Sequence, residues 1–342
     1  MANPVISIVL PTYNGAKYIR QSIDSCLAQT FQDFELIIVN DCSTDETARI
    51  IEEYAAKDPR VRVIHNQFNK KLPLSLNTGF DAALGHYHTW TSDDNYYAAT
   101  ALETMLNCFS QGGQEVGLVY SDYTIIDDAG VITGTRTFNN IYDSFANWLG
   151  CGACFLYKAE VYKANNGYNP SAFLIEDYDF FMRAFLKVTF KYYPSYALYY
   201  YREHPSSLTS TQGDHVNYLS KMMVERQMPL FEQKLPAKQL ALLYRKFAVF
   251  NAVQKNNASK YGLYLSKLWR ISKKQTLITV CFVPLQKILL SISVSINGVA
   301  QFLKIIGRRN WGIGTQATFL YRLLRGGIGQ WLPKYLRMGL VK

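Results

Sequence analysis

His86-Tyr-His-Thr-Trp-Thr-Ser-Asp-Asp-Asn-Tyr-Tyr97 combines a strand-like pattern with two adjacent carboxylates. Its first half alternates residue types that suit a pleated surface, and Gly85 marks its start, so we predict a short strand. The strand delivers Asp93 and Asp94 to its carboxyl end, where open α/β sheets bind their ligands. Two neighbouring carboxylates are costly there unless a cation compensates them, and a divalent metal that carries a phosphate would do so.

The alternative interpretation of this acidic pair is a helix cap. Asp is favoured at helix N-termini, and a helix is expected from Ala98 to Gln111. The stretch alone leaves both interpretations open, so the rest of the sequence must decide between them.

Length and charge indicate two parts of different character. A chain of 342 residues with 49% hydrophobic residues can bury a large core and has room for about two domains. Residues 1–214 hold 15 Lys and Arg against 24 Asp and Glu, a net charge of −9. Residues 215–342 hold 21 Lys and Arg against 2 Asp and Glu, a net charge of +19. We therefore predict a boundary at residue 214 between an acidic domain and a basic, helical region.

The cysteines and the N-terminal residues indicate the compartment. The cysteines at positions 26, 42, 108, 151, 154 and 281 follow no disulfide framework, which is typical of reduced thiols in a cytosolic protein. Cys151-Gly-Ala-Cys154 has no second ligand pair nearby for zinc, so we interpret it as structural. The apolar run Val5–Leu10 lacks a basic lead and ends at Pro11, which argues against a secretory signal.

The first 65 residues alternate strand and helix patterns. Runs of β-forming residues predict strands at Val5–Leu10, Glu35–Asn40 and Arg60–His65. Helical spacing of apolar residues predicts two helices between them, with Asn14 as the cap of the first and a Ser43–Glu46 capping box for the second. This alternation requires a parallel, Rossmann-like sheet.

The second strand of this sheet ends at Asp41, where an acidic residue can accept hydrogen bonds from a ribose or a base. Neither GxGxxG nor GxxxxGK[ST] occurs in the sequence, which argues against a dinucleotide enzyme and a P-loop enzyme. A bound diphosphate would then have to be neutralised by a metal or by side chains. Asp93 and Asp94 can fill this role by holding the metal.

Several motifs along roughly residues 4–210 resemble those of family 2 glycosyltransferases of the GT-A fold. In family order and spacing they are Ser7-Ile-Val-Leu-Pro-Thr-Tyr-Asn-Gly15, Ile38-Val-Asn-Asp-Cys-Ser-Thr-Asp45, Leu76-Asn-Thr-Gly79, Gly85 through Asp94, and Glu176-Asp177. The resemblance implies an α/β GT-A fold with a mostly parallel sheet flanked by helices. It also implies inverting transfer from a nucleotide-sugar donor with a divalent metal, Mn²⁺ or Mg²⁺.

The resemblance also implies roles for single residues. Thr12 and Asp41 would hold the nucleoside, and Asn14 belongs to the same donor-binding group. Asp93 would contact ribose or diphosphate, and Asp94 would bind the metal. One departure concerns the ribose contact, because Thr91 stands where many members have an Asp two residues before the pair.

Glu176 and Asp177 begin a predicted helix. Acidic residues are common in a first helical turn because they satisfy the helix dipole, so a stabilised helix start is the alternative interpretation. In the family pattern, however, the Asp of this pair is the general base. An acceptor hydroxyl must lose its proton as it attacks the anomeric carbon from the face opposite the departing diphosphate. We therefore predict Asp177 as the base and Glu176 as the residue that orients the acceptor or the base.

The segment Tyr200–Thr209 is similar to the one that closes many catalytic domains of the family. Its polar residues suit a loop that folds over the diphosphate, with Arg202 on the donor and His204 as a third metal or phosphate contact. A surface or core histidine is the alternative for His204.

The region after residue 214 carries the basic charge. Segments 275–286 and 288–303 are free of charge but too short to span a bilayer, which favours a re-entrant or surface-lying helix. Aromatic residues among Arg and Lys from Trp311 to Arg337 are typical of an interfacial anchor on anionic lipid. We predict a cytoplasmic protein that is peripheral or monotopic at the inner face of the cell membrane. A basic helical subdomain packed on the catalytic domain is the alternative.

The leading functional prediction is a metal-dependent inverting glycosyltransferase of the hexosyltransferase type. It would extend a glycan or a lipid-linked acceptor in cell-surface polysaccharide synthesis. A sugar-1-phosphate nucleotidyltransferase is one alternative, but Pro11–Gly15 lacks the Gly-rich phosphate loop and basic residue that it needs. A nucleic-acid binder is another. Long apolar runs interrupt the basic charges of the tail, so we predict no nucleic-acid partner.

Overall fold

The computed structural model describes residues 3–148, 150–205, 207–253, 255, 257–281 and 283. The chain divides into two compact units, Met1–Thr276 and Leu277–Lys342, and the first holds nearly all of the described residues. The boundary predicted at residue 214 falls within helix α8 (Leu208–Arg226) of the first unit. As a division between two domains it stays a prediction.

A large sheet forms the centre of the first unit, with the strand order β10-β6-β9-β4-β1-β2-β3. Its strands are β1 (Ile6–Thr12), β2 (Phe34–Asn40), β3 (Val61–His65), β4 (Tyr87–Trp90), β6 (Val116–Ser121), β9 (Phe155–Lys158) and β10 (Thr189–Tyr193). Strand β9 runs antiparallel to β4 and β6, and the other pairings are parallel. The predicted mostly parallel α/β sheet is confirmed.

A second, four-stranded sheet has the order β5-β11-β7-β8. Its strands are β5 (Tyr96–Tyr97), β11 (Tyr199–Arg202), β7 (Tyr123–Ile126) and β8 (Ile132–Arg136). Strands β7 and β8 form an antiparallel hairpin, and Gly130 adopts a φ of +86° in its turn, a conformation that glycine takes without strain. Because β11 pairs with β5 and β7, this sheet brings the segment after β11 close to the residues that follow β4.

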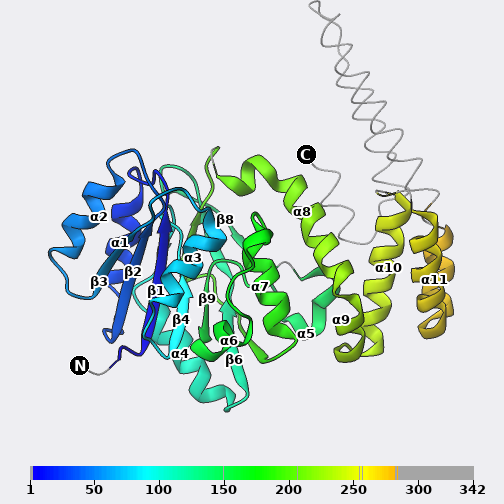
Figure 1. Ribbon diagram of the computed structural model, residues 1–342. Coiled ribbons are helices and arrows are strands. Elements are labelled where there is room, and N and C mark those ends of the chain that lie inside the picture. Colours follow the sequence, from blue (N-terminus) through cyan, green and yellow to red (C-terminus); the bar gives the residue numbers. More distant parts are fainter. Residues whose placement is uncertain are drawn as a thin grey trace, which may run out of the picture. The chain divides into compact units, whose positions relative to one another are not determined.

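Helices flank the large sheet and continue beyond it (Figure 1). Those of the α/β part are α1 (Ile19–Leu27), α2 (Thr47–Ala55), α3 (Leu72–Asp81), α4 (Ala101–Gly112), α5 (Ile141–Ser144), α6 (Ala159–Ala164) and α7 (Glu176–Phe185), with the 3₁₀ turns η1 (Phe145–Asn147) and η2 (Pro170–Ala172). The predicted helical region follows as α8, α9 (Met228–Lys234), α10 (Ala237–Val253) and α11 (Ala258–Ile271). Helix α8 contacts α7, and α10 contacts η1, so this region packs on the α/β part.

The core lies around β1 and β2, whose residues are all buried. Both strands are runs of β-forming apolar residues, and α3 packs against both of them. A parallel strand that is covered on both faces needs apolar side chains on both, which explains the absence of alternation in these two runs. These two buried strands end side by side, and the polar residues Thr12 and Asp41 lie at their carboxyl ends.

Two predicted helix starts are wrong. Helix α1 begins at Ile19, so Asn14 is not its cap; Asn14 has a φ of +57°, and its Oδ1 accepts a hydrogen bond from Thr44 N at 2.8 Å. The capping box before α2 is also absent, because Ser43 Oγ instead accepts a hydrogen bond from Asn14 N at 3.0 Å. Both side chains join the loops after β1 and β2, a tertiary use that local sequence patterns do not reveal.

The helix-cap interpretation of Asp93 and Asp94 is wrong as well. Helix α4 begins at Ala101, three residues after the predicted start, and strand β5 lies between it and the acidic pair. The pair therefore stands in a loop between two strands, and a role at a helix end cannot account for it.

Candidate active site

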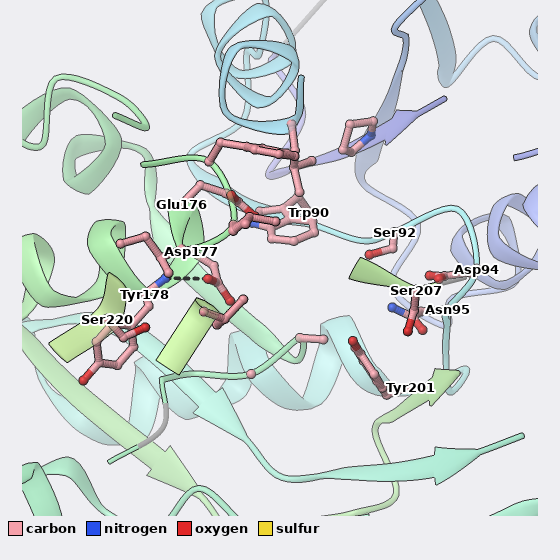
Figure 2. A pocket seen from close by; sticks show the side chains of 18 of the residues that line it. Trp90, Ser92, Asp94, Asn95, Glu176, Asp177, Tyr178, Tyr201, Ser207 and Ser220 are labelled. Atoms are coloured by element: carbon pink, nitrogen blue, oxygen red, sulfur yellow. Dashed lines mark hydrogen bonds between the residues drawn. The ribbon is translucent and has the colours of Figure 1, made fainter. Parts of the chain in front are cut away.

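A cleft of about 920 Å³ lies at the carboxyl ends of β1, β2 and β4. Its lining also includes the start of α7 and the segment after β11. Each of the predicted site residues except Arg202 lines this cleft. Figure 2 shows the acidic start of α7 at one end and the residues that follow β4 at the other: Glu176, Asp177 and Tyr178 against Ser92, Asp94 and Asn95.

Asp93 is held by the turn that follows β1. Thr12 Oγ1 donates a hydrogen bond to Asp93 Oδ2 at 2.5 Å. Gly15 packs against the same carboxylate so closely that a Cβ there would lie 2.1 Å from Asp93 Oδ2. Burial, and then the negative charge of Asp94, raise the pKa of Asp93 to about 7. The carboxylate is fixed in position, and a ligand that donates a hydrogen bond or brings a cation would offset the cost of its charge.

Asp94 and His204 meet although they lie far apart in the sequence. His204 Nε2 is 3.1 Å from Asp94 Oδ2. The other carboxylate oxygen, Asp94 Oδ1, is buried and has no hydrogen-bond partner among the described residues. Burial raises the pKa of Asp94, and the hydrogen bond with His204 opposes this shift. A buried, unsatisfied carboxylate oxygen beside an imidazole suits a divalent cation that takes oxygen and nitrogen ligands.

The described part of the chain contains no group of three His, Cys, Asp or Glu side chains that could hold a metal ion by themselves. Asp94 and His204 offer two protein ligands. Ions such as Mg²⁺ are commonly held by one or two carboxylates together with substrate phosphates and water. The residues present therefore fit a metal that binds together with the diphosphate of a donor.

Asp41 is engaged by the protein itself. Its Oδ1 accepts hydrogen bonds from Asn66 Nδ2 and Lys70 N, both at 2.8 Å, and its Oδ2 accepts one from Lys71 N at 2.9 Å. The buried carboxylate thus holds the segment between β3 and α3 against the cleft. Its predicted contact with the nucleoside stays a prediction.

Arg202 is buried behind the cleft and does not line it. Its guanidinium donates hydrogen bonds at 2.6 to 3.0 Å to the carbonyl oxygens of Asp94, Asp127 and Asp128 and to Gln21 Oε1. These bonds fix the backbone at Asp94. The guanidinium therefore supports this loop. Direct contact between Arg202 and the donor stays a prediction.

Thr91 occupies the position at which the sequence departs from the family pattern. Its Oγ1 lies 2.7 Å from the hydroxyl of Tyr199, and both side chains are buried. A neutral hydrogen-bonded pair therefore fills this position, so Thr91 adds no carboxylate to those of Asp93 and Asp94. Any acidic contact with a ribose in this stretch would have to come from Asp93.

Glu176 and Asp177 begin α7, as predicted. Leu174, just before them, has a φ of +78°, which is strained for a residue with a side chain and is common near functional sites. Asp177 Oδ1 accepts a hydrogen bond from Tyr178 N at 2.6 Å, and Glu176 Oε2 is buried without a hydrogen-bond partner among the described residues. Burial raises the pKa of both carboxyls, and the charge of Asp177 raises the pKa of Glu176 further. A first-turn helix dipole alone would lower these pKa values, so burial in the cleft dominates.

Sequence reasoning missed the wall that the C-terminal helices add to the cleft. Helix α8 contributes Ser220 and Lys221, and α10 contributes Lys246 and Phe247. No short motif marks these residues, because they come from two helices that meet only in the folded protein. Their helical periodicity predicts helices but does not predict which surface they cover.

The sequence profile of the family described as "Glycosyl transferase family 2" matches residues 7–165. An uncharacterized glycosyltransferase of Rickettsia typhi is 30% identical over 218 residues, which cover 61% of this chain and 67% of that protein. A chondroitin synthase of Escherichia coli is 31% identical over 182 residues, which cover 53% of this chain but 26% of that protein. The matches span 21% and 38% of the length of relatives from Rickettsia felis and Rickettsia prowazekii.

The fold is similar to that of S. aureus TarS, whose residues 1–349 have been crystallised in complex with UDP. The TM-score is 0.57 at 18% sequence identity, and the alignment covers 83% of this chain and 88% of that chain. At this identity the likeness shows the fold, which is the α/β arrangement expected from the sequence motifs, followed by helices.

Proposed function

Because the chain belongs to glycosyltransferase family 2, we propose that it is an inverting glycosyltransferase that moves a sugar from a nucleotide-sugar donor to a hydroxyl of a glycan or lipid-linked acceptor. The observation that carries the proposal is the presence of two acidic pairs, Asp93–Asp94 and Glu176–Asp177, in one cleft at the carboxyl ends of the strands. One pair suits a donor with its metal, and the other suits proton removal from an acceptor. A sugar-1-phosphate nucleotidyltransferase would need a Gly-rich phosphate loop and a basic residue after the first strand, and Pro11–Gly15 provides neither.

In this proposal the donor lies at the Asp93–Asp94 end of the cleft. Thr12 holds Asp93 in place for a ribose or diphosphate contact, and Arg202 fixes the backbone of Asp94. Asp94 and His204 would hold Mn²⁺ or Mg²⁺. When bound, such an ion supplies charge neutralisation for the diphosphate as it leaves. Asp41 keeps the nucleoside end of the cleft in shape through its bonds to the loop after β3.

The chemical step belongs to Asp177. The oxygen of the acceptor hydroxyl forms a bond to the anomeric carbon, the bond from that carbon to the diphosphate oxygen breaks, and the hydroxyl proton passes to Asp177. The N–H of Tyr178 fixes Oδ1, which leaves Oδ2 to accept this proton. A raised pKa brings the carboxylate closer to the neutral range in which proton transfer is efficient.

Glu176 acts beside the base. Burial and the charge of Asp177 raise the pKa of Glu176, so its carboxyl retains its proton at a higher pH than an ordinary glutamate does. A protonated carboxyl can donate a hydrogen bond. We infer that Glu176 orients the acceptor and does not compete with Asp177 for the proton.

The test is a screen of nucleotide sugars for hydrolysis by the full chain, with Mn²⁺, with Mg²⁺ and with EDTA. Slow release of nucleoside diphosphate from one donor, dependent on metal, is the expected result, because water replaces the missing acceptor. The absence of turnover from every donor of a panel of UDP-, GDP- and dTDP-sugars, by a folded and metal-supplied sample, would contradict the proposal. UDP-sugars are the first to try, because TarS, whose fold is similar, has been crystallised in complex with UDP.

We propose that the chain works at the inner face of the cell membrane. Among the described residues, no helix is long and apolar enough to cross a bilayer. Segment 275–286 is described in part, while segment 288–303 and the residues from Trp311 to Arg337 lie outside the described residues. Support comes from α11 and the residues just after it: Leu263, Trp269 and Arg270 of α11 are exposed, and exposed Lys273 lies over the ring of Trp269. Aromatic and basic side chains together suit an anionic lipid surface.

Co-sedimentation with vesicles tests this placement. The full chain should pellet with phosphatidylglycerol-containing vesicles and stay bound when salt is raised, because salt does not screen the burial of apolar side chains. Vesicles of phosphatidylcholine alone are the control for the charge requirement. If the full chain remains in the supernatant with anionic vesicles at low salt, the proposed membrane association is wrong.

A further inference from the structure

Lys17 stands at the rim of the cleft, at the end where the donor is proposed to bind. It lines the cleft two residues after Gly15, which packs closely against the carboxylate of Asp93. Its ammonium nitrogen lies 4.7 Å from the centroid of the Tyr18 ring, and the centroid of that ring lies 5.6 Å from the centroid of the His204 ring. Because the ammonium and the imidazole both pack on Tyr18, Lys17 is close to the candidate metal site.

The carboxylate of Asp128 holds this ammonium. Lys17 Nζ donates hydrogen bonds to both carboxylate oxygens, at 2.8 and 2.9 Å, although 111 residues separate the two along the chain. Asp128 lies in the turn between β7 and β8 and does not line the cleft. The side chains of Lys17 and Asp128 are 64% and 53% exposed. An exposed ion pair is weak because water screens the attraction, so a more highly charged anion can displace the carboxylate.

The turn between β7 and β8 does not need the carboxylate of Asp128. Asp127 Oδ1 accepts hydrogen bonds from two backbone N–H groups of the turn, both at 2.9 Å. Arg202 donates hydrogen bonds to the carbonyl oxygens of Asp127 and Asp128, both at 3.0 Å. In the described part of the chain, the Asp128 carboxylate accepts side-chain hydrogen bonds from Lys17 alone. The carboxylate therefore positions Lys17 and is not required for the turn.

We propose that Lys17 leaves Asp128 to bind the diphosphate of the donor. The inference rests on the proposed transfer activity, because it assigns a further binding residue to the diphosphate that lies beside Asp94 and His204. A lysine ammonium binds phosphate as a point charge on a flexible stem, so the same side chain can turn from the carboxylate to the ligand. The carboxylates of Asp93 and Asp94 repel the diphosphate, and Lys17 helps the metal to offset this repulsion.

Calorimetric titration of the full chain with UDP and saturating Mn²⁺ tests this exchange. GDP and dTDP replace UDP if wild type does not bind it. Lys17→Met should weaken nucleotide binding about 10-fold, as expected for the loss of a charged hydrogen bond. Asp128→Asn should strengthen nucleotide binding about 2- to 5-fold, because it releases the ammonium from a weak ion pair. Uridine, which carries no phosphate, should bind wild type and both variants equally.

The double variant Lys17→Met/Asp128→Asn separates the release of Lys17 from a general effect of charge. Asp128→Asn also removes a negative charge near the diphosphate, which could strengthen binding by itself. If Asp128 acts through Lys17, its replacement should bring no gain in the Lys17→Met background, and the double variant should bind UDP as Lys17→Met does. A gain that persists in the double variant overturns the proposal.

Arg20→Met is the matched control. Arg20 lies on α1, three residues after Lys17, and pairs with Glu53 at 2.8 Å outside the cleft, so this variant should bind UDP as wild type does. The replaced side chains are all exposed, and every variant should melt near the wild-type temperature. Unchanged nucleotide binding in Lys17→Met overturns this inference alone. If wild type binds none of the three nucleotides with Mn²⁺, the proposed transfer activity is overturned together with it.

Discussion

His204 Nε2 lies 3.1 Å from Asp94 Oδ2, although 110 residues separate the two along the chain. The first residue follows β11 of the small sheet, and the second follows β4 of the large one. The pairing of β11 with β5 and β7 fixes their approach, and Arg202 strengthens it with a hydrogen bond to the carbonyl oxygen of Asp94. The candidate metal site is therefore built where the two sheets meet.

Replacement of Asp94 by Ala should have the same effect as chelation. Both leave the diphosphate charge uncompensated, so UDP binding should lose its dependence on Mn²⁺ and weaken by at least about 10-fold, since a charged contact is lost. Calorimetry with and without Mn²⁺ measures this. Asp214→Ala, which removes an exposed carboxylate, is the control and should bind UDP as wild type does. Full activity of wild type in excess EDTA would remove the metal from the mechanism.

Asp177→Asn should abolish transfer and leave donor binding nearly intact. The carboxylate is assigned to proton removal, which contributes on the order of 10²- to 10⁴-fold to rate. The variant should bind UDP with a wild-type Kd while kcat falls by about that factor. Asp179→Asn is the matched control, because Asp179 lies on the same helix but forms an ion pair with Arg183 at 2.7 Å. It should lower thermal stability and spare transfer by the folded fraction; transfer at wild-type rate in Asp177→Asn would exclude Asp177 as the base.

As the pH is lowered, the rate of transfer should begin to fall at a higher pH than it would with a base of ordinary aspartate pKa. Asp177 accepts a proton only when it is ionised, and burial raises its pKa. The acid limb of log kcat/KM should therefore lie above the usual range of aspartate, near 3.9. Activity should be lost as the pH falls through the raised pKa and be full above it. A pH profile of kcat/KM measures the limb, and a limb centred near pH 4 would mean that the buried carboxyl is not the base.

Much of the fold could be predicted because its strands are local runs. The residues around Val9 and Ile37 are continuous apolar segments, and such runs predict buried parallel strands whatever else the chain does. The acidic pairs were predictable for a related reason: each follows a strand or begins a helix, so topology alone sends it to the edge of the sheet. A helical region was predicted after residue 214, and α9, α10 and α11 lie within it, whereas α8 begins earlier, at Leu208.

The contacts between loops could not be predicted. Asn14 and Ser43 are good capping residues, yet in the structure each bonds the loop of the other. The hydrogen bonds from Arg202 to backbone carbonyl oxygens were not anticipated either, while its predicted contact with the donor stays a prediction. These hydrogen-bond partners depend on how distant segments of the chain pack together, which the local patterns of a single sequence do not reveal. The position of the α8 and α10 lysines in the wall of the cleft could not be predicted for the same reason.

Gly15→Ala should weaken donor binding without unfolding the protein. A Cβ at this position would lie 2.1 Å from Asp93 Oδ2 and 2.6 Å from Thr12 Oγ1, distances that force the short side chain of Asp93 to move. Displacement of a binding group by about 1 Å can cost on the order of 10²-fold in rate, so kcat/KM should fall by roughly that factor. Gly262→Ala is the matched control, because in the described part of the chain the added Cβ would meet nothing within 4 Å apart from the nearby backbone of its own helix. Both variants should melt near the wild-type temperature, and normal kcat/KM in Gly15→Ala would show that the position of Asp93 does not matter to the donor.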